Sequence, residues 1–354
     1  MRTRAFRTIA AATALATAGL SSESFGAGPA SATTTSLGIK GPSIIAISGA
    51  NAFVINHNVN GNGSFITEFN TATGALVRVL SAKSYGFIDS VAIAFSGANA
   101  FVINGGGNSV TEFNTATGAL VRVLSAKSYG FNSPHDIAIS GANAFVTNLY
   151  WGNSITEFDT TTGALVRVLS AKSYGFNYPQ NIAISGANAF VINTNGNSIT
   201  EFDTATGALV RVLSAKGYEF NWPWPIAISG ANAFVASRHS ASNNFSITEF
   251  NTATGALVRV LSAKSYGFSY SQDIAFSGAN AFVINGNSAR YGNSITEFNT
   301  ATGALVRVFS ANSYGFSYPK SIAFSGANAF VTNFGGNSIT EFNTATGALV
   351  KVLR

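Results

Sequence analysis

The chain has 354 residues, no cysteine, 46% hydrophobic residues and only 10% charged residues, with 36 Gly and 29 Phe. This apolar composition excludes an intrinsically disordered chain, and the absence of Cys excludes disulfides, so a hydrophobic core alone must hold the fold. The net charge of +6 is mild, and no basic stripe indicates nucleic-acid binding.

Residues 1–32 have the pattern of a secretory signal peptide. Three arginines within the first seven residues form a basic start, residues 9–20 form a short Ala-rich apolar run, and Ala30-Ser31-Ala32 matches an A-x-A cleavage site. The run is too short for a membrane-spanning helix, and nothing later in the sequence resembles one. We therefore expect a secreted, extracellular protein without membrane insertion, with a lead-in over residues 33–43.

Residues 44–354 consist of seven near-copies of one unit. The segment 292–309, GNSITEFNTATGALVRVF, recurs with few changes. A glutamate marks the same point of each copy at spacings of 44 to 48 residues: Glu68, Glu112, Glu157, Glu201, Glu249, Glu297 and Glu341. Repeats of about 40–50 residues with strand signals are typical of propeller blades.

The unit at residues 137–169 shows four short candidate strands, rich in Ile, Val, Phe and Thr and separated by turn residues. They are predicted at residues 137–140, 144–148, 154–159 and 164–169, and the link 170–181 leads to the next unit. Solenoids have shorter coils and a different leucine spacing. The sequence therefore predicts an all-β, seven-bladed β-propeller with four antiparallel strands per blade. Because the first and last units are complete, no strand exchange is expected at closure.

The hairpin between the third and fourth strands predicts an ion pair. Gly74 fits the left-handed position of a three-residue loop, and counting back from it places Glu68 opposite Arg78. The same count gives Phe69–Val77, Ile66–Leu80, Glu112–Arg122, Glu157–Arg167, Glu201–Arg211, Glu249–Arg259, Glu297–Arg307 and Glu341–Lys351. These glutamates thus have a structural explanation, and seven equivalent copies argue against catalysis.

Two of the second strands carry a family signature. Phe145-Val146-Thr147-Asn148 and Phe330-Val331-Thr332-Asn333 resemble YVTN-type propeller repeats, with Phe where the family name has Tyr. The wider unit is similar to NHL-type repeats: an Ile-Ala strand, a strand ending in Asn, then Gly-Asn-Ser, a third strand and a turn ending in Gly. The resemblance covers nearly all of the expected mature chain, residues 33–354, and implies a WD-like blade, but no particular function, because such propellers serve many roles.

The copies differ mainly on one face of the disc. Since antiparallel strands alternate in direction, the second-to-third loops and the blade-to-blade links share this variable face. It holds all three Trp and all three His, and binding residues tend to lie on loops held by a rigid scaffold. The predicted ligand-binding residues are Tyr150, Trp151, Trp222, Trp224, Arg238, His239, Arg290 and Tyr291.

Flat rings and hydrogen-bond donors together suit a non-catalytic module that binds an extracellular polysaccharide or, in second place, a protein. We expect a monomer without a cofactor. Two alternatives stay open at this point. In one, Trp222 and Trp224 serve only to fill the space between blades. In the other, the whole propeller is a spacer in a purely structural surface protein.

A third alternative is enzymatic. Streptogramin lyases are seven-bladed propellers of similar repeat style that use a His and a metal on one face, and the resemblance to them is one of fold. It implies a metal-dependent enzyme, with His135 and His239 in suitable loops. Apart from that resemblance, His135, Asp136 and Asp273 are candidates for metal or acid–base chemistry near the central channel. The three His have no metal-binding spacing, and phosphate-loop, Rossmann and nucleophile-elbow motifs are absent from the sequence, which favours binding over catalysis.

Overall fold

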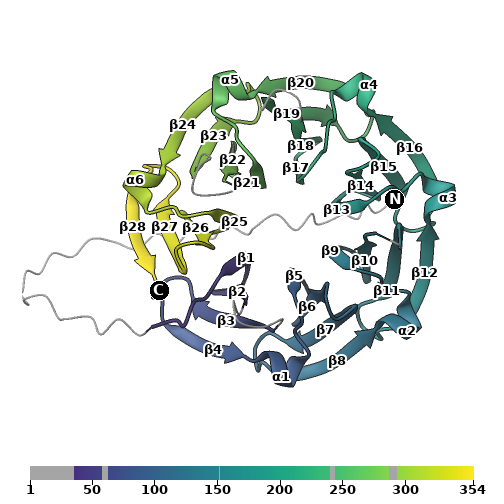
Figure 1. The fold of residues 1–354 in the computed structure, drawn as a ribbon, viewed down its shortest axis with the longest axis horizontal. Coiled ribbons are helices and arrows are strands. Elements are labelled where there is room, and N and C mark those ends of the chain that lie inside the picture. The colour runs from purple at the N-terminus through teal and green to yellow at the C-terminus, as the bar shows by residue number, and fades with distance from the viewer. Residues whose placement is uncertain (1–35, 58–62, 151, 240–243, 287–292) are drawn as a thin grey trace, which may run out of the picture.

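The computed structural model describes residues 36–57, 63–150, 152–239, 244–286 and 293–354. In these residues the chain forms seven antiparallel sheets of four strands each, arranged as blades around a central axis (Figure 1). The predicted seven-bladed β-propeller is therefore confirmed. The predicted signal peptide, residues 1–32, lies outside the described residues, so secretion stays a prediction.

Within each blade the strands follow the chain order from the centre to the rim. Blades 1 to 4 comprise β1 (Pro42–Ser48), β2 (Asn51–His57), β3 (Ser64–Asn70) and β4 (Leu76–Leu80); β5 (Ser90–Ser96), β6 (Asn99–Asn104), β7 (Ser109–Asn114) and β8 (Leu120–Ser125); β9 (Pro134–Ser140), β10 (Asn143–Asn148), β11 (Ser154–Asp159) and β12 (Leu165–Ser170); β13 (Pro179–Ser185), β14 (Asn188–Asn193), β15 (Ser198–Asp203) and β16 (Leu209–Ser214).

Blades 5 to 7 comprise β17 (Ile226–Ser229), β18 (Asn232–His239), β19 (Asn244–Asn251) and β20 (Leu257–Ser262); β21 (Ser271–Ser277), β22 (Asn280–Asn285), β23 (Ser294–Asn299) and β24 (Leu305–Ser310); β25 (Pro319–Ser325), β26 (Asn328–Asn333), β27 (Ser338–Asn343) and β28 (Leu349–Leu353). One-turn helices begin six of the links: α1 (Ala82–Tyr85), α2 (Ala126–Tyr129), α3 (Ala171–Tyr174), α4 (Ala215–Tyr218), α5 (Ala263–Tyr266) and α6 (Ala311–Tyr314).

The helices were not expected from the sequence. The link after β12, for example, opens with α3, in which the ring of Tyr174 stacks on Phe176 with centroids 5.2 Å apart. The Tyr174 hydroxyl donates a hydrogen bond to the carbonyl of Gly207 in the next blade. The recurring Ser-Tyr-Gly-Phe segment thus packs one blade on the next. Of the helices in the described ranges, none is long and apolar enough to span a membrane.

The core lies between blades and is built from the repeated phenylalanines. Phe145 on β10 lies against Phe202 on β15 of the following blade, with ring centroids 5.8 Å apart, and neither is accessible to solvent. The β-branched and aromatic residues of the second and third strands therefore face neighbouring blades on both sides, which explains why these strands are nearly invariant along the chain.

The predicted Glu–Arg register is confirmed in all seven blades, with Lys351 as the partner in the last. Gly74 adopts the predicted left-handed conformation, with φ of 76°. One neighbouring pair was predicted wrongly: Phe69 faces Leu76 instead of Val77. A bulge between Glu68 and Phe69 adds a residue to the fourth strand there, which shifts the count by one.

The ring closes without strand exchange, as predicted, because blades 1 and 7 each contain their own four strands. The lead-in contributes differently. Leu37 and Ile39 are buried between the first and last blades, where they replace the Tyr85 and Phe87 of an ordinary link. The backbone N–H of Leu37 also donates to the carbonyl of Arg354, at 2.7 Å. The segment therefore seals the junction by packing.

Candidate functional site

Each link between blades ends at a residue with a left-handed backbone, which we call the turn position. Its φ lies between 46° and 60° in every blade. The residues are Gly41, Asp89, Ser133, Tyr178, Trp222, Tyr270 and Tyr318. At five of these positions, Gly41, Ser133, Tyr178, Trp222 and Tyr318, an asparagine of the preceding blade's Gly-Asn-Ser loop accepts the backbone N–H, as Asn197 does for Trp222 at 2.7 Å. The fold thus imposes this conformation whichever side chain is present.

Four consecutive blades, 4 to 7, carry an aromatic ring at the turn position. A left-handed backbone costs an L-residue about 1–2 kcal/mol, whereas glycine, as at Gly41, adopts it freely. The backbone conformation alone would therefore favour glycine over the aromatic residues found here. Residues held in such unfavourable conformations tend to cluster at binding and catalytic sites, which makes blades 4 to 7 the candidate location of a site.

Two residues further on lies a second variable point, the bulge position. In six blades the register between the first and second strands shifts here. Such bulges turn a side chain out of the regular alternation. The residues at this position are Ser43, Val91, His135, Gln180, Trp224, Gln272 and Lys320. They vary more than the strands that hold them, so the innermost edge of the variable face differs from blade to blade.

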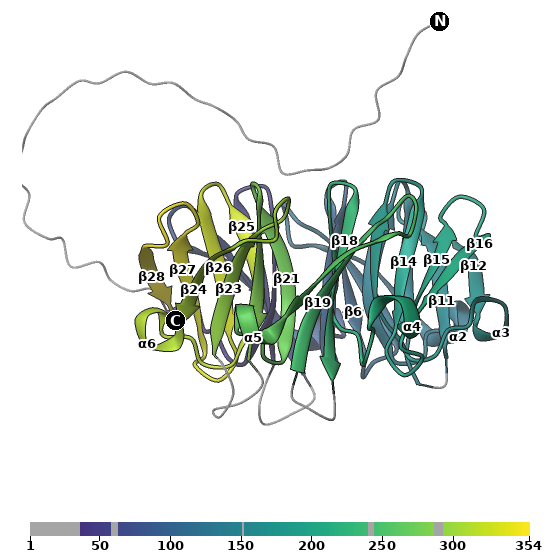
Figure 2. The same ribbon diagram turned by 90° about the horizontal axis from the view of Figure 1, so that it is seen from above.

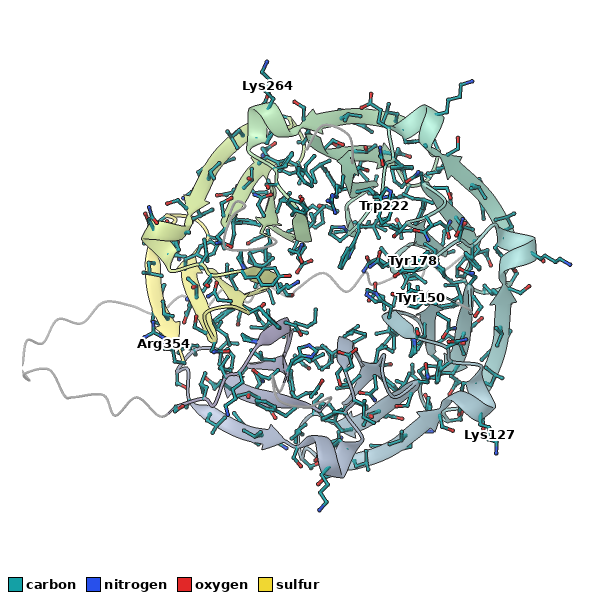
Figure 3. All side chains as sticks on the ribbon, in the orientation of Figure 1. Lys127, Tyr150, Tyr178, Trp222, Lys264 and Arg354 are labelled. Atoms are coloured by element: carbon teal, nitrogen blue, oxygen red, sulfur yellow. The ribbon has the colours of Figure 1, made fainter. Side chains whose placement is uncertain are left out.

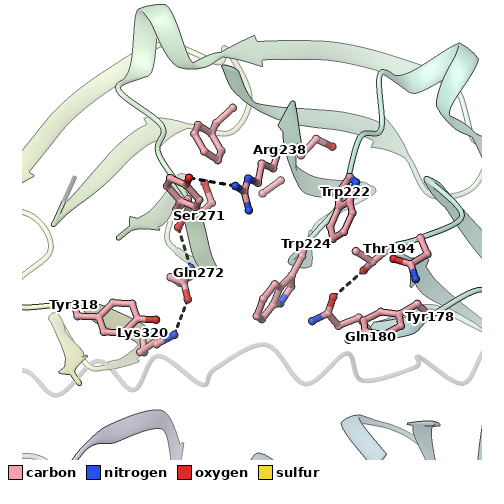
Figure 4. A pocket seen from close by; sticks show the side chains of 15 residues that line it. Tyr178, Gln180, Thr194, Trp222, Trp224, Arg238, Ser271, Gln272, Tyr318 and Lys320 are labelled. Atoms are coloured by element: carbon pink, nitrogen blue, oxygen red, sulfur yellow. Dashed lines mark hydrogen bonds between the residues drawn. The ribbon is translucent and has the colours of Figure 1, made fainter. Parts of the chain in front are cut away.

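A cavity of about 520 Å³ opens on this face over blades 4 to 7 (Figure 4). Its volume is typical of a small-molecule site. The turn and bulge residues of the four blades line it together with Thr194 and Asn195, which follow β14, and residues from the end of β18 and the start of β19. The lining residues are Tyr178, Gln180, Thr194, Asn195, Trp222, Trp224, Ala236, Ser237, Arg238, Phe245, Tyr270, Ser271, Gln272, Tyr318 and Lys320.

Two cations are held against rings in this cavity. The Arg238 guanidinium carbon lies 4.6 Å from the centroid of Tyr270, and its Nη2 donates to the Tyr270 hydroxyl at 3.2 Å. The Lys320 Nζ lies 4.2 Å from the centroid of Tyr318 and donates to Gln272 Oε1 at 3.0 Å. Among the described residues that line the cavity, none is acidic. The cavity therefore combines apolar surface with positive charge.

Three predicted binding residues meet in this cavity: Trp222, Trp224 and Arg238. Trp222 is 53% exposed and Trp224 37% exposed, so neither ring serves to fill space between blades. Tyr150 lies beside the cavity, with its ring edge-on to Tyr178 at 5.0 Å (Figure 3). Burial, aided by the contact with Tyr150, raises the pKa of Tyr178 to about 12 and keeps its hydroxyl a hydrogen-bond donor.

The other predicted binding residues cannot be placed. Trp151, Arg290 and Tyr291 lie outside the described residues. The backbone of His239 ends β18, and its side chain is likewise outside the description.

Sequence reasoning named three of the fifteen lining residues, and it missed the other turn and bulge residues of the cavity: Tyr178, Gln180, Tyr270, Gln272, Tyr318 and Lys320. A signal was present in the links. When the links are aligned with one another, an aromatic residue recurs at the turn position of blades 4 to 7, and the variable bulge residue follows two positions later.

The three residues predicted for metal or acid–base chemistry lie on the first strands of blades 3 and 6, and each has its own hydrogen-bond partners. His135 Nδ1 donates to the Gln180 carbonyl at 3.0 Å, its ring lies 6.1 Å from Trp224, and burial lowers its pKa. Burial raises the pKa of Asp136, and its Oδ2 accepts the Ile182 N–H of the next blade at 3.0 Å.

Asp273 repeats this arrangement three blades later. Its Oδ2 accepts the Ile322 N–H and the Ser321 hydroxyl, both at 3.0 Å, and burial raises its pKa to about 6. Both aspartates therefore tie a first strand to the next blade. In the part of the chain that the structure describes, no three His, Asp or Glu side chains gather in a group that could hold a metal ion.

The sequence matches no protein-family model, and no curated protein is significantly similar to it. Solved structures with the same fold do exist. Kuenenia stuttgartiensis hydrazine synthase is 18% identical, with a TM-score of 0.61 over 75% of this chain and 86% of its own. A functionally unknown protein from Desulfotomaculum acetoxidans is 17% identical, with a TM-score of 0.64 over 85% and 95%.

The Myceliophteria thermophila Cps50 (Swd1) β-propeller domain is similar at 12% identity, with a TM-score of 0.64 over 85% of this chain and 95% of its own. Such identities support the propeller fold alone. The YVTN- or NHL-type resemblance therefore stays an interpretation of the repeats.

Proposed function

We propose that this protein is a secreted binding propeller that holds an extracellular polysaccharide in the cavity over blades 4 to 7. The observation that carries the proposal is the run of four rings at the turn position, Tyr178, Trp222, Tyr270 and Tyr318, which frame one cavity. Flat, partly exposed rings give a sugar ring an apolar face to lie on, while nearby amides and hydroxyls supply hydrogen bonds.

The charge of the cavity selects among polysaccharides. Arg238 and Lys320 have only ring and neutral polar partners in the contacts described here, and the described lining residues include no carboxylate. A ligand with carboxylate groups would neutralise both cations, whereas a neutral polymer would have to leave them unpaired. Glycans that contain uronic acids thus fit better than neutral glucans, and such binding should weaken with added salt.

The test is affinity electrophoresis and calorimetry of residues 33–354 with polygalacturonate, alginate and neutral dextran. We expect retardation by the acidic polymers, and a loss of about 2 kcal/mol, roughly 30-fold in affinity, for Trp222→Ala and Trp224→Ala. Arg238→Gln and Lys320→Gln should weaken binding of the acidic polymers and reduce its salt dependence. Melting temperatures should change little, because all four side chains are at least partly exposed.

Thr161→Ala is the matched control, since Thr161 lies on the opposite face, in the exposed turn between β11 and β12. This variant should bind like the unmodified protein. Failure of all three polymers to bind, or unchanged binding in both Trp variants, would overturn the proposal. Binding of dextran alone would retain the polysaccharide and remove the requirement for acidic groups.

A further inference from the structure

Blade 1 carries a pair of residues at the variable face that no other blade repeats. Ser43 occupies the bulge position, and His57 ends β2 directly beside it. The Ser43 Oγ and the His57 Nε2 are 2.8 Å apart. The other ring nitrogen, Nδ1, lies 3.8 Å from Oδ1 of Asp89, which occupies the turn position of blade 2. The order of atoms is hydroxyl, imidazole, carboxylate.

This order is the one in which a serine becomes a nucleophile. A neutral imidazole can accept the Ser43 proton at Nε2 only if Nδ1 carries the ring hydrogen, and a carboxylate on the Nδ1 side favours that tautomer. His57 is about three-quarters buried and Ser43 is half-buried at the channel mouth, so the imidazole is shielded and the hydroxyl can be reached. The ring of Phe334 lies 6.3 Å from the imidazole, centroid to centroid, on the side of the neighbouring blade 7.

We propose that Ser43, His57 and Asp89 form a site for ester hydrolysis at the mouth of the channel. Ser43 is the nucleophile, His57 the general base and Asp89 the residue that orients His57. Lys320, at the bulge position of the neighbouring blade 7, lies close enough for its charge to act on His57. This inference goes beyond the proposed binding function and does not depend on it.

The reaction has two halves. The Ser43 Oγ attacks the ester carbonyl carbon and gives its proton to His57 Nε2; the tetrahedral intermediate then expels the alcohol, which leaves with that proton. Water attacks the acyl-Ser43 carbonyl and gives a proton to Nε2, and the acid departs as the proton returns to the Ser43 Oγ. The sum is ester plus water to acid plus alcohol.

The placement of the site suggests a small ester group as substrate. The Phe334 ring lies 6.3 Å from the His57 ring and 6.0 Å from the Lys320 Nζ, and Lys320 also lines the cavity over blades 4 to 7. A chain held in that cavity could therefore present an ester, such as an O-acetyl group, to Ser43. This choice of substrate rests on the proposed polysaccharide binding, whereas the chemistry at Ser43 does not.

The experiment is labelling of residues 33–354 with a fluorophosphonate, which reacts with activated serines, together with hydrolysis of p-nitrophenyl acetate. We expect one label, located at Ser43 by peptide mass spectrometry. Ser43→Ala should lose the label and the turnover, and His57→Gln should lower the hydrolysis rate by about 10²-fold or more. Asp89→Asn should have a smaller effect, because the 3.8 Å separation and its exposed side chain make the contact weak.

The dependence of the hydrolysis rate on pH distinguishes a general base from a residue with a purely structural role at His57. Burial lowers the pKa of His57, the charge of Lys320 lowers it further and Asp89 opposes both, so the rate should rise with pH around a midpoint below 6.5. Ser125→Ala, at the exposed end of β8, is the control and should label and turn over like the unmodified protein.

Ser43→Ala should fold, since the Ser43 hydroxyl contacts only His57 and, at 3.4 Å, the Ile55 carbonyl among the described residues. Absence of any label, a label elsewhere, or hydrolysis that survives Ser43→Ala would overturn the proposal. None of these outcomes bears on binding of polygalacturonate. Conversely, labelling at Ser43 without binding of any polymer would keep the hydrolytic site and reject the polysaccharide.

Discussion

At the scale of single residues, the repeated ion pair joins blades as well as strands. Glu157 is fully buried, and its Oε1 accepts Asn143 while its Oε2 lies 2.5 Å from Arg167 Nε. The other end of the guanidinium donates to the Ala205 carbonyl of the next blade at 2.7 Å. Removing the carboxylate would therefore leave a partly buried cation and an unpaired amide at an interface between blades.

We predict that Glu157→Ala lowers the free energy of unfolding by about 3 kcal/mol, because a buried carboxylate is removed from a partner that keeps some contact with water. Lys172→Ala, in the exposed one-turn helix α3, should change it by less than about 0.5 kcal/mol. Thermal and urea unfolding would measure both. Equal shifts for the two variants would show that the pair contributes no more than a surface contact.

Asp273 makes stability depend on pH. Its pKa is raised from 3.8 to about 6, mainly by burial, so the folded chain binds this proton more tightly than the unfolded chain does. The stabilising contribution is then complete below pH 3.8 and is lost as the pH rises through about 6. The full change amounts to about 3 kcal/mol at 1.36 kcal/mol per unit.

The corresponding test compares Asp273→Asn with the unmodified protein from pH 4 to pH 7. Burial also raises the pKa of the paired glutamates, such as Glu68 and Glu112, so the total stability carries their contribution too. The difference between the two proteins isolates Asp273. We expect the unmodified protein to lose stability relative to Asp273→Asn as the pH rises. Parallel curves of stability against pH would contradict the assignment.

At the scale of elements, each link fixes the backbone conformation of its turn position but does not determine which side chain stands there. The amide of Trp222 is fixed by Asn197, and more than half of its ring is in solvent. Its left-handed φ of 48° is then a cost that the rest of the blade must offset.

We predict that Trp222→Gly is more stable than Trp222→Ala by about 1 kcal/mol, because both variants lose the ring and only glycine fits the left-handed backbone. The matched comparison is Val166, an exposed residue on β12 with ordinary strand geometry. There the order should reverse, with alanine the more stable. Denaturant unfolding of the four variants checks this, and the same order at both sites would mean that the turn position is not strained.

Strand register is the part of the fold that could be predicted from the sequence in most detail. Local counting from Gly74 was enough to pair Glu68 with Arg78, because a short hairpin fixes its own register. It failed one residue later at Phe69, since nothing in the local sequence marks the bulge.

The candidate sites lie further from what the sequence can predict. Trp222, Trp224 and Arg238 were found because they break the repeat, whereas the cavity they share depends on how four blades are spaced around the axis. The approach of Ser43, His57 and Asp89 was invisible, because the three belong to different elements that meet only in the folded ring.

At the scale of the whole molecule, closure depends on a short segment outside the strands. Leu37 is 1% exposed and packs with residues of blades 1 and 7, including Phe69 and Phe330. Since no strand crosses the junction, this packing and the first-to-last blade contact must carry it alone. The junction also lacks the tyrosine hydroxyl that other links supply, because Leu37 stands in the place of that Tyr.

We predict that Leu37→Ala lowers the free energy of unfolding by about 2–4 kcal/mol, as expected when a buried leucine leaves a cavity. Leu165→Ala, at an exposed site on the outer strand of blade 3, should cost less than about 1 kcal/mol. Calorimetry of both variants would measure the two changes in the free energy of unfolding. A small effect at Leu37 would show that the first and last blades close the ring without the lead-in.

The separation of constant strands from variable links has a consequence for how such a protein can change. Every blade keeps its phenylalanines and the glutamate of its charged pair buried, and the blades differ from one another at the turn and bulge positions around the mouth of the channel. Copying one unit of 44 to 48 residues therefore duplicates a complete scaffold and a fresh pair of mouth residues at once. Substitutions at the turn and bulge positions change the side chains that line the channel mouth and leave the buried core unchanged. New binding specificities can therefore arise one blade at a time.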